Sequence, residues 1–274
     1  MAKFAPVAPI QVLEGLYAAG PQVFGDYHLL LAHHTVEHRK RFEDLFARIS
    51  EDTRNCKGPG KDGISDITVI MDNSIVELGG AVDDDMICKA VDAIDFPFVN
   101  VIPVLPDVMG QGEATRQLSA EAYERWVKDE MPGEGYCAVC QGDSIGDFQQ
   151  SLSFFGNKER FPLVEMLSIP RYLHKTVGSR VRPAVDARPY FDTHKIHFLG
   201  FCDDVTDDID SVSIIPEACI DSAVPLRVRE AFTEFTNAGK RPADWFETAQ
   251  VDKQMLQNLE NARRMFKFDH AGDE

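Results

Sequence analysis

The sequence predicts an α/β fold, and within that class a (β/α)8 TIM-like barrel formed by a single domain. Short apolar runs rich in β-branched residues alternate with amphipathic segments, a pattern typical of repeated strand-helix units around a mostly parallel sheet. The 274 residues are enough for one such barrel. We therefore expect one domain over 1–274, with a barrel core at about 26–237 and a C-terminal helix at 251–266 packed on it.

Seven segments have the composition of buried strands, and an eighth segment is a weaker candidate. Each strand candidate is a short, mostly apolar run bounded by polar or turn-forming residues. The predicted strands are 27–32, 66–71, 98–105, 135–140, 163–167, 196–201 and 218–221. Segment 211–215 is the candidate for an eighth strand.

Amphipathic segments between and after these strands predict the helices. Their apolar residues recur every three to four positions, so that one face of each helix can pack on the sheet. The predicted helices are 36–49, 84–94, 114–129, 145–154, a stretch within 171–190, 228–237 and 251–266. The apolar stripe of the last helix predicts that it packs against the barrel.

The charge balance excludes some classes of protein. Lys and Arg total 28 against 45 Asp and Glu, a net charge of −17, which counts against a nonspecific nucleic-acid binder. No apolar run could span a bilayer and no signal peptide opens the sequence, so we expect a cytoplasmic protein without membrane contact.

The six scattered cysteines are expected to be free thiols. A local basic patch can still hold phosphates, and the candidates are Lys175, Arg180, Arg182, Arg227 and Arg229.

Polar residues follow nearly every predicted strand. In a parallel barrel the carboxyl ends of the strands converge on one mouth, where catalytic side chains emerge. The residues in this position are Asp72, Asn73, Asp107, Gln141, Gly142, Asp143, Ser168, Gly200, Asp221 and Ser222. One Asp after a strand is usually a turn or helix cap. Two carboxylates at one mouth can supply the nucleophile and the proton-transfer group for substitution at a sugar carbon, so the pattern favours glycosidic-bond chemistry.

Four segments together resemble one enzyme family. Residues 221–227, Asp-Ser-Ala-Val-Pro-Leu-Arg, resemble the nucleophile segment Asp-Cys-Val-(Met/Leu)-Pro-Thr-Arg of the tRNA-guanine transglycosylases. Residues 197–201 are similar to that family's Tyr-Leu-Met-Gly-Val, and residues 139–143 to its Val-Gln-Gly-Gly. Residues 72–74, Asp-Asn-Ser, look closest to phage-type relatives that insert 7-deazaguanines into DNA, the DpdA type. The motifs keep the family order and cover most of the predicted barrel.

The resemblance implies an enzyme that exchanges guanine in a nucleic acid for a 7-deazaguanine such as preQ0. Asp221 would attack the anomeric carbon and expel guanine, which leaves a covalent glycosyl-enzyme. Asp72 would take the N9 proton of the incoming base. The target base must leave the helical stack to reach such a site.

The resemblance also implies a pocket for the base. Asp107 would bind the N1 and exocyclic amine edge, since a carboxylate can pair with both of these donors. Gln141 and the Gly142 amide would meet O6. Arg227 and Arg229 would hold flanking phosphates.

The remaining implied contacts lie around the base. Ser168 and Ile169 would supply backbone contacts beside the 7-substituent, and Leu199 would pack on one face of the ring. Gly200 and Asn73 belong to the same expected pocket.

The sequence departs from the tRNA-modifying branch downstream of Asp221. Those enzymes carry zinc there on three cysteines and a histidine, whereas no cysteine follows Asp221 in this chain. We expect no zinc-binding subdomain, no metal and no other cofactor. This departure, the short length and residues 72–74 favour DNA over tRNA. The resemblance is also compatible with a homodimer.

Two other interpretations stay open. Residues 142–146, Gly-Asp-Ser-Ile-Gly, match the G-x-S-x-G elbow of serine hydrolases, with Ser144 as nucleophile. The downstream histidines are His194, His197 and His270, and no His-Gly-Gly-Gly segment precedes the elbow. The third interpretation is a barrel that binds guanine-like bases or nucleic acid without turnover.

Overall fold

The computed structural model describes residues 3–55, 57, 66–131, 133, 135–215, 217–236, 242 and 244–266. It confirms the α/β class, because helices alternate with strands and the strands pair in parallel. The strands are β1 (Lys3–Pro6), β2 (Tyr27–Leu31), β3 (Ile67–Asp72), β4 (Val99–Pro103), β5 (Tyr136–Val139), β6 (Val164–Pro170), β7 (Lys195–Leu199) and β8 (Cys219–Ser222).

The strands form two parallel sheets. One has the order β1-β8-β7-β6-β5 and the other β2-β3-β4. Two isolated parallel bridges lie between the sheets. Val7, just after β1, pairs with Leu29 of β2, and Val104, just after β4, pairs with Cys137 of β5. The edge strands of one sheet therefore lie next to the edge strands of the other.

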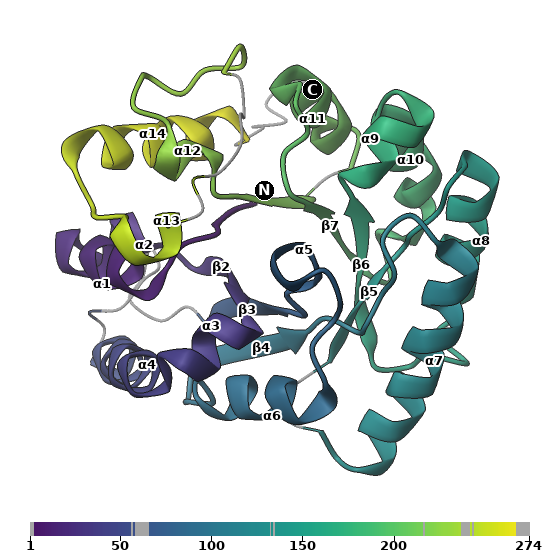
Figure 1. Cartoon of the computed structure of the whole chain (residues 1–274), viewed down its shortest axis with the longest axis horizontal. Helices are drawn as coiled ribbons and strands as arrows, with labels where there is room; N and C mark the ends of the chain where they lie inside the picture. Colours follow the sequence, from purple (N-terminus) through teal and green to yellow (C-terminus); the bar gives the residue numbers. More distant parts are fainter. Residues whose placement is uncertain are drawn as a thin grey trace, which may run out of the picture.

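Most helices lie around the outside of the two sheets, whereas the short α5 (Ile75–Leu78) lies over the middle of the ring of strands (Figure 1). The helices are α1 (Ile10–Ala19), α2 (Pro21–Phe24), α3 (Ala32–Glu37), α4 (Arg39–Arg54), α5 (Ile75–Leu78), α6 (Asp84–Asp92), α7 (Gly112–Lys128), α8 (Ile145–Phe155), α9 (Tyr172–Val177), α10 (Val181–Ala187), α11 (Val205–Ser213), α12 (Val224–Arg227), α13 (Trp245–Thr248) and α14 (Lys253–Met265). A 3-10 helix, Arg188–Tyr190, follows α10. None of the helices in these described ranges is long and apolar enough to cross a membrane.

Side-chain caps explain where several helices begin. Asp83 accepts a hydrogen bond from the Met86 amide at the start of α6, and Asp204 accepts one from the Thr206 amide at the start of α11. Asp252 caps α14 in the same way. Each cap satisfies an amide that has no partner inside the helix. Some of the excess acidic residues of the chain are therefore helix N-caps.

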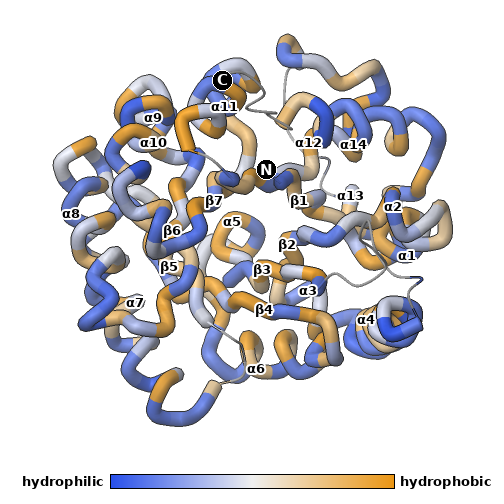
Figure 2. Tube along the Cα trace, turned by 180° about the vertical axis from the view of Figure 1, so that it is seen from behind, coloured by the Kyte–Doolittle hydropathy of each residue, from blue (hydrophilic) through white to orange (hydrophobic). Residues whose placement is uncertain are grey.

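Two hydrophobic clusters hold the elements together. The larger one fills the space between the sheets and the helices, with residues such as Trp126, Phe148 and Phe198. The smaller one gathers inward-facing residues from strands of both sheets, among them Leu29 and Met166. Figure 2 shows hydrophobic residues along the strands and hydrophilic ones along much of the outer helices. This alternation is what a parallel sheet covered by helices requires.

The predicted eighth strand at 211–215 is wrong. Residues 211–213 are the end of α11, and the helix starts at the Asp204 cap. The short run of β-branched residues belongs to a helix whose buried face includes Val205 and Val212. The missing strand is instead β1, which lies outside the predicted core of 26–237 and pairs with β8.

The predicted helix at 228–237 is also wrong for the residues that the structure describes, 228–236, which form no helix. The buried side chain of Asn258 binds this segment. It accepts a hydrogen bond from the Phe232 amide and donates to the carbonyl oxygens of Val228 and Glu230. These backbone groups are satisfied by a side chain of α14, so no helical hydrogen bonds are needed.

Two other predictions need smaller corrections. The predicted helix at 36–49 is divided at His38 between α3 and α4. The stretch within 171–190 holds two α-helices and a 3-10 helix. The predicted C-terminal helix is present as α14, and its buried face contains Met255, Leu259 and Ala262.

Candidate active site

The acidic residues at the carboxyl ends of three strands line one cavity of about 880 Å³. Asp72 ends β3, Asp107 follows β4 and Asp221 lies in β8. The cavity wall includes most of the predicted site: Asp72, Asp107, Gln141, Leu199, Gly200, Asp221 and Arg227. Two carboxylates from distant parts of the chain, Asp72 and Asp221, therefore share one concave site.

Asp221 is held by two donors on a single oxygen. Its Oδ1 atom lies 3.0 Å from the Gly200 amide nitrogen and 2.9 Å from His197 Nε2. The Oδ2 atom makes no hydrogen bond with any residue in the described ranges. Gly200 adopts a left-handed conformation with φ of 68°, which suits glycine and turns its amide toward the carboxylate. One oxygen is thus anchored, and the other is left for a ligand.

A buried chain of polar groups continues behind Asp221. Nδ1 of His197 lies 2.9 Å from the Tyr27 hydroxyl, and both side chains are buried. The Asp221 carboxylate can only accept, so Nε2 of His197 carries the proton of that hydrogen bond. In the tautomer with its proton on Nε2, Nδ1 accepts from the Tyr27 hydroxyl, whose pKa burial raises well above its usual value.

Asp107 accepts hydrogen bonds from two buried amides. The Asn73 and Gln141 side chains each donate to it at 2.7 Å. Burial raises the pKa of Asp107, while these two donors oppose the rise. Gln141 is itself fixed by the Gly110 amide, which donates to its Oε1. A carboxylate oxygen has room for further donors, so Asp107 can still bind a ligand.

Asp72 has a different environment from the other two carboxylates. Its pKa is raised well above the ordinary value, first by burial and then by the charges of Glu77, Asp107 and Asp221. A single backbone donor, the Ser74 amide at 2.9 Å, opposes this rise. Ser74 has φ of 62°, a left-handed conformation that is costly for a residue other than glycine. The strained turn directs its amide at Asp72.

Several predicted site residues do not line the cavity. Asn73 is buried and holds Asp107. Gly142 is packed against the backbone of Phe148, where a side chain would have no room. Ser168 bonds with Cys137, and Ile169 belongs to the larger hydrophobic cluster.

The predicted phosphate contacts also lie in different places. Arg227 lines the cavity, whereas Arg229 is exposed and lies outside its wall. Arg180 is fully buried and pairs with Asp208. Arg182 pairs with Asp186 on the surface of α10. Lys175 is the other predicted cation that lines the cavity.

Ser144, the nucleophile of the hydrolase interpretation, is a helix cap. Its hydroxyl oxygen accepts a hydrogen bond from the Asp147 amide at the start of α8, and its side chain does not line the cavity. His194 precedes β7, at the opposite end of the sheet, and His197 is bound to Asp221. His270 lies outside the described residues. No observation favours a serine hydrolase.

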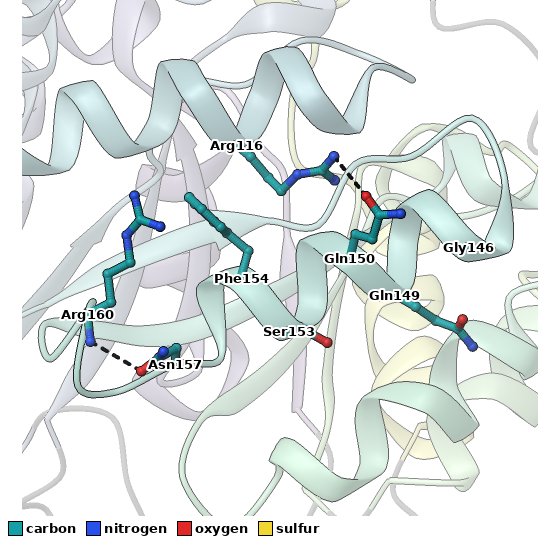
Figure 3. A pocket seen from close by; sticks show the side chains of 8 residues that line it. All are labelled: Arg116, Gly146, Gln149, Gln150, Ser153, Phe154, Asn157 and Arg160. Carbon is teal, nitrogen blue, oxygen red and sulfur yellow. Dashed lines mark hydrogen bonds between the residues drawn. The ribbon is translucent and has the colours of Figure 1, made fainter.

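A second hollow of about 750 Å³ lies along α8, with Arg116 of α7 on one side (Figure 3). Arg116 forms an ion pair with Asp147, and the Arg160 guanidinium lies over the Phe154 ring. None of the predicted site residues lines this hollow. Its charged groups already have partners in the contacts that fix α8.

Two groups of side chains in the described ranges bring potential metal ligands within 4.8 Å of one another. One is His34, Glu37 and His38, in and after α3. The other is His174, Cys202 and Asp207, beside the cavity. In the second group Asp207 already accepts hydrogen bonds from His174 Nδ1, the Ser179 hydroxyl and the Arg180 amide. The described ranges contain every cysteine except Cys56, and the described cysteines are free thiols, as predicted.

Comparison with known proteins leaves the activity undefined. No known family and no curated protein matches the chain. Among solved structures it is similar to the carboxyl transferase domain of pyruvate carboxylase from Rhizobium etli, at 7% identity and a TM-score of 0.34, over 100% of this chain and 50% of that one. It is also similar to the same domain with oxalate, at 8% identity and a TM-score of 0.33, over 94% of this chain and 51% of that one. The chain spans about half the length of these structures, and at these scores the likeness supports no statement about activity.

Proposed function

We propose that the chain is a transglycosylase that replaces guanine in nucleic acid, DNA in preference to tRNA, with a 7-deazaguanine such as preQ0. The observation that carries this proposal is the shared cavity of Asp72 and Asp221. Retained-configuration exchange at a sugar carbon needs a carboxylate nucleophile and a second group that moves a proton. These two side chains have opposite environments, which suits them to the two roles.

We further propose that the two sheets close into the (β/α)8 barrel that the sequence predicts. The bridges Val7–Leu29 and Val104–Cys137 support closure, because they join the edge strands at both places where the sheets meet. The inner hydrophobic cluster, which draws on strands of both sheets, supports it as well. In such a barrel the cavity occupies the mouth at the carboxyl ends of the strands.

In the first step Oδ2 of Asp221 forms a bond to the anomeric carbon while the bond from that carbon to guanine N9 breaks. The electron pair of the broken bond goes to the guanine. The anchored Oδ1 supports this assignment, because both of its donors orient the carboxylate with Oδ2 toward the cavity. Asp72 gives its proton to the leaving base, and its raised pKa supports a protonated resting state.

In the second step the incoming base returns the proton. Its N9 loses a proton to the Asp72 carboxylate as N9 attacks the anomeric carbon, and the bond from that carbon to Asp221 Oδ2 breaks. Asp72 is then protonated again and Asp221 is ionised, so protons and charges balance over one exchange. The side chains described supply every group in this sequence, and we propose that it uses no metal or other cofactor.

The base is proposed to bind over Asp107, whose carboxylate faces the two donors of the guanine edge. Asn73 and Gln141 hold Asp107 for this contact. One amide proton of Gln141 remains for O6 of the base. Leu199 lines the cavity and packs on the ring. Gly142, Ser168 and Ile169 have no place in this arrangement, because they lie behind the cavity wall.

An exchange assay tests the function. Purified protein is offered labelled guanine or preQ0 together with DNA or tRNA, and incorporation into the polymer is measured. We expect incorporation by wild type and a loss of at least about 10³-fold in Asp221→Ala, the size seen when a catalytic nucleophile is removed. Asp203→Ala, which removes an exposed carboxylate at the cavity rim, is the control. Equal rates in wild type and Asp221→Ala would show that the nucleophile is assigned wrongly.

A further inference from the structure

Two neighbouring cations on the cavity wall have no partner among the residues that the structure describes. Arg171 immediately precedes α9, Lys175 lies one turn later, and both line the cavity that contains Asp221. Neither side chain makes a hydrogen bond or ion pair with any residue that the structure describes. Like charges four residues apart on a helix repel, so this arrangement is unfavourable for the protein alone.

Some helical cations elsewhere in the chain pair with an acidic side chain four residues away, namely Lys40, Lys89, Arg182 and Arg264. Others on the outer surface, such as Lys128 and Lys253, make no such pair with the described residues, so the position of Arg171 and Lys175 in the cavity wall is what sets them apart. The chain has 45 acidic residues available for such pairs against 28 Lys and Arg. Two neighbouring cations in the wall of a concave site, without an ion pair among the described residues, are placed to attract a negatively charged ligand group.

The backbone places this pair beside the nucleophile. The Arg171 amide donates to the Leu199 carbonyl oxygen at 3.0 Å. The side-chain stem of Arg171 lies over Gly200, where an added Cβ would be 3.3 Å from its Cδ. Gly200 in turn donates to Asp221. Gly200 therefore contacts both Arg171 and Asp221, and a ligand group bound to Arg171 lies close to the carboxylate that attacks the sugar.

A histidine between the two cations completes the wall. Nδ1 of His174 lies 3.2 Å from Asp207 Oδ2, and the ring lines the same cavity. Asp207 is fixed by the Ser179 hydroxyl and the Arg180 amide. A carboxylate that accepts from Nδ1 sets the ring orientation, and a neutral imidazole that donates from Nδ1 has an acceptor at Nε2. His174 therefore shapes the wall between the two cations, which are the donors for a phosphate.

We propose that Arg171 and Lys175 form a phosphate subsite, which binds the phosphate next to the sugar that Asp221 attacks. This inference rests on the proposed function and divides its cavity into two parts. The Asp107 carboxylate accepts from the base and repels a phosphate, and Asp72 exchanges a proton with the base. The cationic wall binds the phosphate and fixes the sugar between the two, with Arg as the fork-shaped donor and Lys as the point charge.

The experiment measures binding rather than exchange. The dissociation constant of a fluorescent single-stranded oligodeoxynucleotide containing guanine is determined at several salt concentrations. In the double variant Arg171→Gln/Lys175→Gln we expect weaker binding and a salt slope smaller by about 1.4, since each contact with a single strand contributes about 0.7. The matched control is Lys128→Gln/Lys253→Gln, which makes the same change in net charge at two exposed helix positions outside the cavity.

A second measurement separates the sources of the phosphate. Deoxyguanosine and its 5′-monophosphate are compared as ligands for wild type and for the double variant. A preference for the monophosphate that disappears in the variant shows a site for a mononucleotide phosphate. A change in the oligonucleotide slope alone shows a site for the phosphodiester. The subsite would be overturned if the salt slope were the same in wild type and in the cavity variant. It would also be overturned if the matched control reduced the slope as much as the cavity variant does.

The result also separates this inference from the proposed function. Binding needs no turnover, so a reduced slope in a protein that exchanges no base leaves the phosphate subsite intact and removes the transglycosylase. Exchange without any change in slope removes only the subsite. Thermal unfolding of both double variants checks that each is folded.

Discussion

Asp221 and Asp72 lie in the same cavity, yet the protein treats them in opposite ways. Asp221 receives two donors on Oδ1, from Gly200 and His197. Asp72 receives one backbone donor and has the acidic groups of Glu77, Asp107 and Asp221 as charged neighbours. The comparison teaches that the surroundings of a carboxyl group, rather than its type, decide whether it serves as an anion or as a proton carrier.

The largest effect after loss of the nucleophile is expected for Asp72→Asn. The variant cannot move a proton to or from N9, so the exchange rate should fall by roughly 10²- to 10⁴-fold. The same variant should be more stable than wild type at neutral pH. The folded protein holds the Asp72 proton more tightly than the unfolded chain does. Wild-type stability therefore declines as pH rises from the unfolded pKa of about 4 through the raised folded pKa, and Asn avoids this decline.

Thermal unfolding of both proteins across pH checks this sign. The difference in Tm, variant minus wild type, should be positive at pH 7 and shrink toward pH 4. A variant that is less stable than wild type at pH 7 would mean that Asp72 is stabilised as an anion, and the contrast with Asp221 would disappear.

The next effect concerns the chain behind Asp221. In His197→Phe the carboxylate loses one of its two anchors, and we expect kcat to fall roughly 10- to 100-fold with little change in KM, the loss typical of a small misplacement. His197→Gln keeps a donor and should recover part of the rate. The ¹⁵N shifts of wild-type His197 should show a proton on Nε2 and none on Nδ1. Equal rates for the Phe and Gln variants would limit His197 to packing.

Glu77→Gln should move the pH profile with a smaller change in maximal rate. Glu77 is the largest charge contribution to the raised pKa of Asp72, so its removal lowers that pKa. Departure of guanine needs protonated Asp72, and the high-pH limb of the rate should shift to lower pH by at most about one unit. Glu124→Gln on the exposed face of α7 is the control and should leave the limb in place.

The smallest effect on activity is expected for Ser144→Ala. The exchange rate should equal that of wild type, while loss of the α8 cap should reduce the free energy of unfolding by about 1 kcal/mol. Chemical denaturation measures the second quantity. Loss of activity in a folded Ser144→Ala protein would restore the hydrolase interpretation.

The sequence was enough to predict the acidic residues at the strand ends, but not the buried side chains that hydrogen-bond to them. Asp72, Asp107 and Asp221 were predictable because each follows an apolar run in a chain with the alternation of an α/β fold. His197 was within a predicted strand, and a polar residue inside an apolar run is a signal that a polar partner is buried there. Its partners come from β2 and β8, so their identity required the pairing of strands distant in sequence.

Errors of one or two residues account for the misplaced contacts. Ile169 of β6 faces the larger hydrophobic cluster, on the opposite side of the strand from Pro170, which reaches the cavity. Ser168 faces the same side as Pro170 but lies two residues before the strand end, where it is buried against Cys137. The strand β1 has only four residues, too few to show a period. Lys175 and Arg227 were recognised as cations in the sequence, but only the fold separates them from the buried Arg180.

The pairing of β1 with β8 ties the formation of the site to the order of synthesis. Ala5 lies in register with Asp221, so β1, which is synthesised before β2 to β8, is a neighbour of the strand that carries the nucleophile. Closing so long a loop is slow, and a nascent chain that ends before β8 holds β1 without this partner. Asp72 and Asp107 are already synthesised at that stage, but the site lacks its third carboxylate until translation has passed residue 221.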